Sequence, residues 1–254
     1  MKLLVLIFSC KKNIDRCLAI QQTWLQDLKQ NHIEYFFVSA DNLELQEPSI
    51  KLENFTECYE QLPLKTFLTL KQIYNYKFTH LVKTDDDVFL NIKKLIATLP
   101  KNVDYSGKFN LKDLDASKIH YYKCNREFRI PKKKASHDYA EGGMYILSKK
   151  AVKYIVSCDQ KIFINSPKTY KGEDVAVGEL LNNEKFTKLD LTDSLSDKLN
   201  MDITRNDVSY HPVHKSLMHK LYKAKTTNER IDILVANAAK NDYNKRDIFI
   251  RKYE

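Results

Sequence analysis

The sequence contains little glycine. Only five of its 254 residues are glycines, at positions 107, 142, 143, 172 and 178. A Walker A phosphate loop needs two glycines five positions apart, and the Rossmann dinucleotide fingerprint needs three at fixed offsets. No pair or triplet of these glycines fits either pattern. If the protein binds a nucleotide, it must therefore hold it with other groups.

Cysteine is also sparse. The five cysteines are an odd number, are widely spaced and form no Cys-x-x-Cys pair. This pattern argues against a disulfide framework and against a zinc site. We expect free thiols in a reducing compartment.

Long apolar runs are absent as well. The N-terminal run from Leu3 to Phe8 is too short for a signal peptide, and a membrane span needs about twenty apolar residues. We therefore expect a buried first strand, no integral membrane segment and a soluble, cytoplasmic protein.

The charge is unbalanced toward the positive side. Lys and Arg number 42 and Asp and Glu 33, which gives a formal net charge of +9. The lysines are scattered, apart from a cluster at Lys132–Lys134, and no helix-turn-helix, zinc finger or aromatic RNA platform is visible. The charge is interpreted as favouring solubility, and nucleic acid is not expected as a partner.

Apolar patterns that predict strands and helices alternate along the chain. Strands are predicted at 3–9, 33–39, 80–84 and 144–148, and helices at 13–30, 64–73, 91–99, 149–157, 173–181, 213–223 and 226–240. Such alternation is typical of a mostly parallel sheet with helices on both faces. The sequence therefore predicts a single α/β domain.

Three consecutive carboxylates follow the strand predicted at 80–84. Asp85, Asp86 and Asp87 stand at its carboxyl end, where ligands bind in open α/β sheets. In extended backbone, Asp85 and Asp87 point to the same side. Carboxylate oxygens suit hard cations such as Mg²⁺ and Mn²⁺, and a cation would replace a glycine loop as the partner of a diphosphate. The alternative interpretation is a solvated acidic turn.

Several segments, in order, resemble the β-1,3-galactosyltransferase and Fringe-related family of glycosyltransferases over roughly residues 3–220. The resembling segments are RCLAIQQTWL (16–25), YFFVSA (35–40), FTECYEQLPLKTFLTLKQI (55–73), LVKTDDDVFLN (81–91), YSGK (105–108), YAEGGMYILS (139–148) and GEDVAVGELL (172–181). The resemblance implies a single-domain GT-A fold, a Rossmann-like α/β/α sandwich with a mostly parallel sheet. Residues 1–225 would form the catalytic domain, and 226–254 a helical extension packed on it.

The resemblance also implies a metal site. It assigns Asp87 as a direct ligand of Mn²⁺ or Mg²⁺, and it places Asp85 and Asp86 at the nucleotide, its ribose or metal-bound water, with Asp85 counted in the metal site. His211, just ahead of Pro212, matches the position of the family's metal-binding histidine, and His214 is the second choice.

A carboxylate that accepts a proton is expected near Gly172. Glu173 and Asp174 both stand at a predicted helix start, where the helix dipole favours the ionised form, but acidic residues there are also ordinary helix caps. The residues alone do not choose between them. The resemblance points to Asp174 as the general base, and it groups Glu173 with the donor-binding residues.

Three further residues are candidates for donor binding. Gly142 and Gly143 lie in a predicted strand, where glycine marks close approach of a ligand or, alternatively, a bulge. Lys83 is expected to support the carboxylates or the phosphate, and the alternative is a solvent-facing lysine at a strand end.

Together these features predict a metal-dependent inverting glycosyltransferase. It would move galactose or N-acetylglucosamine from a UDP-sugar to a hydroxyl group of a glycan acceptor and form a β-1,3-type linkage. The alternative is a catalytically silent domain of the same fold that binds a nucleotide sugar or a carbohydrate.

Overall fold

The first strand, β1 (Leu3–Phe8), lies in the interior of the protein, and all of its side chains are buried. It pairs in parallel with β2 (Glu34–Ser39) on one side and with β4 (His80–Asp85) on the other. A strand that is covered on both faces needs an apolar residue at every position, which explains the continuous run LLVLIF. The computed structural model describes residues 1–99, 101–110, 137–165, 171–183, 185–191, 202–203, 209–211 and 213–240.

The central sheet contains seven strands in the order β3-β2-β1-β4-β7-β6-β8. The remaining strands are β3 (Ser49–Lys51), β6 (Tyr105–Asn110), β7 (Tyr139–Ser148) and β8 (Lys188–Asp190). β7 runs antiparallel to both of its neighbours, β4 and β6, whereas the other neighbouring pairs are parallel. The predicted mostly parallel sheet is therefore confirmed.

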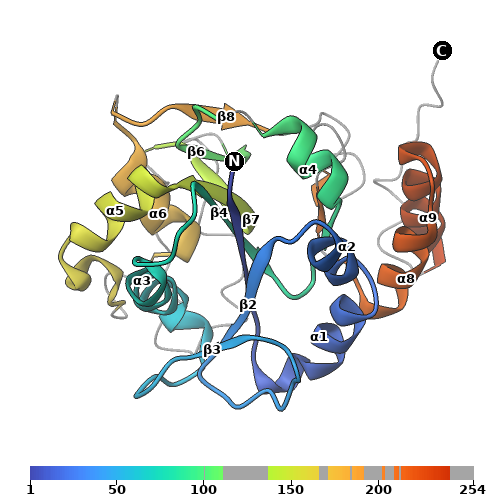
Figure 1. Ribbon diagram of the computed structural model, residues 1–254, viewed down its shortest axis with the longest axis horizontal. Helices are drawn as coiled ribbons and strands as arrows, with labels where there is room; N and C mark the ends of the chain where they lie inside the picture. The colour runs from blue at the N-terminus through green and yellow to red at the C-terminus, as the bar shows by residue number, and fades with distance from the viewer. Residues whose placement is uncertain are drawn as a thin grey trace.

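Helices cover both faces of this sheet (Figure 1). One face carries α1 (Ile14–Gln21), α2 (Leu25–Gln30), α4 (Ile92–Thr98), α8 (Lys215–Lys223) and α9 (Thr227–Lys240); the other carries α3 (Leu62–Ile73), α5 (Lys149–Ser157) and α6 (Glu173–Leu181). Alternate side chains of β1 enter two separate hydrophobic clusters, one under each helical layer. This α/β/α sandwich is the GT-A architecture that the resemblance implied.

The predicted helix at 13–30 is in fact two helices, separated at Gln22–Trp24. The Thr23 hydroxyl donates a hydrogen bond to the Ala19 carbonyl oxygen at 2.7 Å, a side-chain bond that competes with the regular helix pattern. The strand predicted at 144–148 begins earlier, at Tyr139. The helices predicted at 149–157 and 173–181 are confirmed to the residue.

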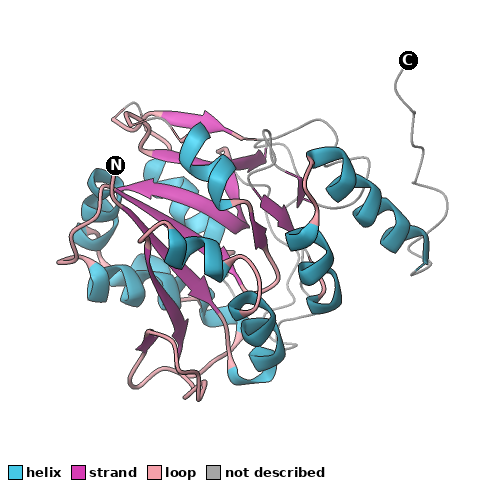
Figure 2. Cartoon of the chain, turned by 45° about the vertical axis from the view of Figure 1, so that its right-hand side comes forward, coloured by secondary structure: helices cyan, strands magenta, loops and turns pink. Residues whose placement is uncertain are grey.

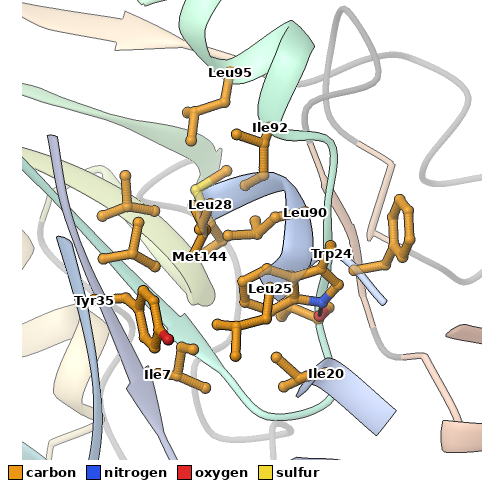
Figure 3. Close-up of a cluster of buried hydrophobic side chains, with 14 of the residues drawn as sticks. Ile7, Ile20, Trp24, Leu25, Leu28, Tyr35, Leu90, Ile92, Leu95 and Met144 are labelled. Carbon is orange, nitrogen blue, oxygen red and sulfur yellow. Dashed lines mark hydrogen bonds between the residues drawn. The ribbon is translucent and has the colours of Figure 1, made fainter. Parts of the chain in front are cut away.

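Trp24 is fully buried between the sheet and the first two helices, as the close-up in Figure 3 shows. It packs in the same hydrophobic cluster as Ile20, Leu28 and Met144. Its indole Nε1 donates a hydrogen bond to the Val88 carbonyl oxygen at 3.1 Å. The core thus fixes the main chain directly after the acidic triplet.

A second, smaller sheet joins the C-terminal part of the chain to this region (Figure 2). Its strands are β5 (Phe89–Leu90), β10 (Ser209–His211) and β9 (Asp202–Ile203), all paired antiparallel. β5 begins two residues after Asp87, so β10 lies beside the acidic triplet. α8 packs on α1, and α9 packs on α8. The predicted division of the chain at 225–226 falls between α8 and α9 and stays a prediction.

The structure also describes most of the cysteines and the helices that could be compared with a membrane span. The four cysteines within the described residues, Cys10, Cys17, Cys58 and Cys158, are free thiols, as expected. Within the same residues, none of the helices has the length and apolar character needed to cross a membrane. Cys124 and the cluster Lys132–Lys134 lie outside the described residues.

Candidate active site

The acidic triplet lies where β1 and β4 end side by side. Phe8 pairs with Asp85 in the parallel register, so Ser9 stands next to Asp86. The three carboxylates have different surroundings, although Asp86 and Asp87 share one partner, Arg16. Asp85 contacts Lys83, Asp86 points into the protein, and Asp87 contacts Arg16.

Asp86 is the most buried of the three aspartates. Its Oδ2 accepts hydrogen bonds from Ser9 Oγ at 2.7 Å and Asn13 Nδ2 at 2.9 Å, and its Oδ1 accepts one from Arg16 Nη1 at 2.8 Å. Burial raises the pKa of Asp86, while these hydrogen bonds oppose the shift. Both oxygens of Asp86 are therefore engaged by protein groups, and the expected contact between Asp86 and the nucleotide remains a prediction.

Arg16 is a site residue that sequence reasoning did not select. Its Nη1 also lies 3.2 Å from Asp87 Oδ2, so one guanidinium group bridges two of the three carboxylates. Burial lowers the pKa of Arg16, but its bonds to Asp86 and Asp87 more than offset this and raise it. In the sequence, Arg16 is marked only as the first residue of the segment RCLAIQQTWL. The bridge joins residues about seventy positions apart, and no local pattern predicts such a contact.

Lys83 is buried, with only 4% of its side chain exposed, so it is not a solvent-facing lysine. Its Nζ donates to Asp85 Oδ1 at 2.6 Å and to the Gly142 carbonyl oxygen at 2.5 Å, and it lies 3.5 Å from Glu173 Oε2. Burial lowers the pKa of Lys83, but the carboxylates of Asp85 and Glu173 outweigh it and raise the pKa above its ordinary value. Lys83 therefore supports carboxylates, one of the two roles considered for it.

Glu173, the first residue of α6, is also buried. Its Oε1 accepts a hydrogen bond from the Tyr145 hydroxyl and a longer one, at 3.4 Å, from Thr66 Oγ1. Burial raises the pKa of Glu173 to about 7, and the nearby Lys83 ammonium only partly opposes the shift. Its contacts are with protein groups, and its grouping with the donor-binding residues remains a prediction.

This raised pKa predicts a pH-dependent stability term. Between about pH 4.5 and pH 7, Glu173 retains its proton in the folded state but loses it in the unfolded state, so the folded state binds more protons. The stabilisation is therefore complete below pH 4.5 and is lost as the pH rises through about 7. Glu173→Gln cannot titrate. We expect the free energy of unfolding of the wild type, relative to Glu173→Gln, to fall between pH 5 and pH 8.

Urea denaturation of both proteins across this range measures the difference directly. The comparison with Glu173→Gln cancels the titration of the carboxylates that both proteins share. A difference that stays constant, or that grows with pH, would show that Glu173 is ionised in the folded protein throughout.

Asp174 follows Glu173 and is half-buried. Its Oδ2 accepts a hydrogen bond from the Gly142 amide at 3.2 Å, and its Oδ1 accepts one from the Val175 amide at 2.8 Å. Burial raises the pKa of Asp174, and these backbone hydrogen bonds act against the shift. Of the two carboxylates at the start of α6, Asp174 is the more exposed, as a proton acceptor for a bound substrate requires.

Gly142 and Gly143 lie where β7 departs from regular pairing. The register between β6 and β7 changes from Gly107 with Tyr145 to Phe109 with Ala140, so the glycine pair falls in a bulge. The bulge, offered by the sequence as the alternative, is thus present. The Ala140 amide donates to the Tyr105 hydroxyl at 2.8 Å. A ligand contact at these glycines remains a prediction.

Backbone contacts bring the segment that carries His211 and His214 close to Asp87. The Val213 amide donates a hydrogen bond to the Asp87 carbonyl oxygen at 2.6 Å, and Tyr210 pairs with Phe89 in the small sheet. His211, whose side chain lies outside the described residues, therefore has its backbone beside the triplet. His214 is exposed and caps α8, where its side chain accepts from the Ser216 amide.

The donor set fits a hard divalent cation. Asp85 and Asp87 keep 37% and 22% of their side chains exposed, and carboxylate oxygens are the ligands that such a cation prefers. The described side chains, which exclude that of His211, contain no group of three or more His, Cys, Asp or Glu residues with metal-ligand geometry. Asp87 and Asp85, together with His211, would hold the ion.

Three comparisons with known proteins bear on this site. The sequence model of the Galactosyltransferase family matches residues 15–192. A curated relative, hydroxyproline O-galactosyltransferase GALT2 of Arabidopsis thaliana, is 24% identical over 199 residues, which cover 68% of this chain and 27% of that protein. The chain thus spans about a quarter of the length of this relative.

Among solved structures, two similar chains are glycosyltransferases. One is a glycosyltransferase involved in the glycosylation of the major capsid of PBCV-1, with a TM-score of 0.47, 12% identity, and coverage of 75% of this chain and 81% of that chain. The other is the galactosyltransferase LgtC in complex with donor and acceptor sugar analogs, with a TM-score of 0.46, 13% identity, and coverage of 73% and 72%.

Proposed function

Because the chain belongs to the galactosyltransferase family, we propose that it transfers a hexose from a UDP-sugar to a hydroxyl group of a glycan acceptor. The transfer is metal-dependent, inverts the anomeric carbon and forms a β-1,3-type linkage. Galactose is the first choice of sugar, since the family and the curated relative are both named for it, and N-acetylglucosamine is the second.

One observation carries the proposal. Hydrogen bonds through Lys83 and Gly142 join Asp85, a candidate metal ligand, to Asp174, the candidate base. Lys83 Nζ contacts both Asp85 Oδ1 and the Gly142 carbonyl oxygen, and the Gly142 amide contacts Asp174 Oδ2. Hydrogen bonds thus connect Asp85, a carboxylate proposed to serve the donor, to Asp174, the carboxylate proposed to serve the acceptor. This site lies at the carboxyl ends of β1 and β4, where open α/β sheets bind ligands.

The proposed chemistry divides between the two ends of the site. A divalent cation held by Asp87, Asp85 and His211 would act as a Lewis acid on the donor diphosphate. Asp174 accepts the proton of the acceptor hydroxyl, and the hydroxyl oxygen forms a bond to the anomeric carbon of the donor. The bond from that carbon to the diphosphate oxygen breaks, and UDP leaves with the electron pair. Because this is a single displacement, the anomeric configuration inverts.

Neighbouring residues hold Asp85 and Asp87 in place. Ser9, Asn13 and Arg16 fix Asp86 and thereby the turn that presents Asp85 and Asp87. Gly142 and Gly143 keep the bulge of β7 free of side chains on the side of α6, where a Cβ atom at Gly142 would lie 3.0 Å from Glu173 Oε2. These residues are proposed to shape the donor end.

The experiment that tests the proposal is a panel of donors and acceptors. UDP-galactose, UDP-N-acetylglucosamine and UDP-glucose are each incubated with Mn²⁺ and with glycan acceptors, and a hydroxyproline peptide is included because of the relative's name. We expect transfer from UDP-galactose, and a β-anomeric proton in the NMR spectrum of the product. An α-linked product would overturn the inverting mechanism. Binding of UDP without transfer from any donor would favour the silent binding domain instead.

A further inference from the structure

We propose that Lys83 is a positioning residue that sets the orientation of Asp174 through the main chain of Gly142. The inference rests on the proposed function, because it assigns Lys83 to the base of that reaction rather than to the donor phosphate. It concerns a residue that would touch neither substrate.

The contacts form a short path through the protein. Lys83 Nζ donates to the Gly142 carbonyl oxygen at 2.5 Å, and the amide of the same residue donates to Asp174 Oδ2 at 3.2 Å. The position of the Asp174 carboxylate thus depends on where the Gly142 backbone lies, and that backbone is held in turn by the lysine.

The sheet does not hold the Gly142 backbone by itself. Pairing of β7 with β4 reaches Met144 opposite Thr84, and pairing with β6 is interrupted between Tyr145 and Ala140. Gly142 stands inside this interruption, so its polar backbone groups take their partners from side chains. A buried backbone group without a partner is costly, and here Lys83 and Asp174 supply the partners.

Two acidic side chains and two aromatic rings surround the ammonium group of Lys83. Its Nζ lies between the carboxylates of Asp85 and Glu173, and the ring centroids of Phe8 and Tyr145 are 5.1 Å and 5.6 Å away. A buried cation needs such compensation, and the Asp85 carboxylate supplies it, joined by Glu173 where that group is ionised. Asp85 belongs to the donor end and Glu173 to α6, so Lys83 connects the two ends of the site.

The test is a double-mutant cycle between Lys83→Met and Asp174→Asn. Lys83→Met keeps the unbranched chain, one atom shorter, and removes its charge. We expect Lys83→Met to lower kcat about 10²-fold, the loss typical of a misplaced catalytic group, and to change the affinity for UDP and Mn²⁺ less than about threefold. In the Asp174→Asn background, Lys83→Met should add less than about a twofold loss, because the group that it positions is already inactive.

A matched control separates positioning from stability. Asp104 is buried and accepts hydrogen bonds from Ser148 Oγ, Lys150 Nζ and the Thr187 amide, beyond the amino-terminal end of β4. Asp104→Asn should destabilise the fold but leave kcat close to that of the wild type. Equal losses of kcat in Asp104→Asn and Lys83→Met would overturn the proposal.

Other outcomes are equally decisive. A full 10²-fold loss from Lys83→Met in the Asp174→Asn background overturns the proposal, and so does lost UDP affinity at unchanged kcat. Should Lys83→Met not fold, Gly142→Ala replaces it, since its added Cβ would lie 3.0 Å from Glu173 Oε2, so that either this side chain or the Gly142 backbone must shift. Its loss of kcat must likewise disappear in the Asp174→Asn background. An inactive wild type, by contrast, refutes the proposed function itself.

Discussion

Asp174→Asn is expected to lower the rate of sugar transfer by about 10³-fold while donor binding is retained, because general base catalysis contributes about 10²- to 10⁴-fold. The asparagine keeps the size of the side chain and can still accept the hydrogen bond from the Gly142 amide, but it cannot take up a proton. Initial rates of transfer and calorimetric titration with UDP and Mn²⁺ measure the two effects separately.

The matched control is Glu173→Gln, the same change at the neighbouring carboxylate. Glu173 is buried against Tyr145 and Thr66, so its loss should reduce transfer much less than the loss of Asp174. Retained transfer in Asp174→Asn together with an inactive Glu173→Gln would move the role of base to Glu173. The two variants thus decide the question that the residues alone left open.

The second large effect is expected from Asp87→Ala. If Asp87 binds the metal, its removal eliminates the metal-dependent part of UDP binding. It also removes several kcal/mol of stabilisation of the developing diphosphate charge, roughly a thousandfold or more in kcat/KM. Titration of UDP in the presence and absence of Mn²⁺, together with initial rates, gives both quantities.

Asp86→Asn is the control for this variant. It removes the same charge from the next residue, but from a buried carboxylate bonded to Ser9, Asn13 and Arg16. Asp86→Asn should therefore lower the free energy of unfolding by about 1–3 kcal/mol and leave the metal requirement in place. If UDP binding by Asp87→Ala responds to Mn²⁺ as it does in the wild type, Asp87 is not the metal ligand.

The sequence predicts the structure best where a local pattern of residues determines it. The apolar run of β1 predicts a doubly covered strand, and the triplet lies at the carboxyl end of the strand predicted at 80–84, as the sequence predicts. Local periodicity likewise predicts the helices at 149–157 and 173–181. Each of these features leaves a local pattern of apolar and polar residues in the sequence.

The features that sequence reasoning missed depend on tertiary contacts. Arg16 contacts Asp86 and Asp87, which lie about seventy residues later in the sequence. Asp86 points inward because Ser9 and Asn13, which follow β1, donate hydrogen bonds to it. No local pattern contains that information. The break of the helix at Gln22–Trp24 combines a local side-chain hydrogen bond of Thr23 with a tertiary contact, the bond from the buried Trp24 indole to the Val88 carbonyl oxygen.

The central claim is that this chain transfers a sugar with the help of a divalent cation bound at the triplet. The most direct measurement is the rate of UDP release from UDP-galactose in the presence of an acceptor, with Mn²⁺ and after removal of metal by EDTA. We predict release with Mn²⁺, loss of release with EDTA, and recovery when Mn²⁺ is restored. Release at the same rate in EDTA, or none from any UDP-sugar with Mn²⁺ present, would contradict this account.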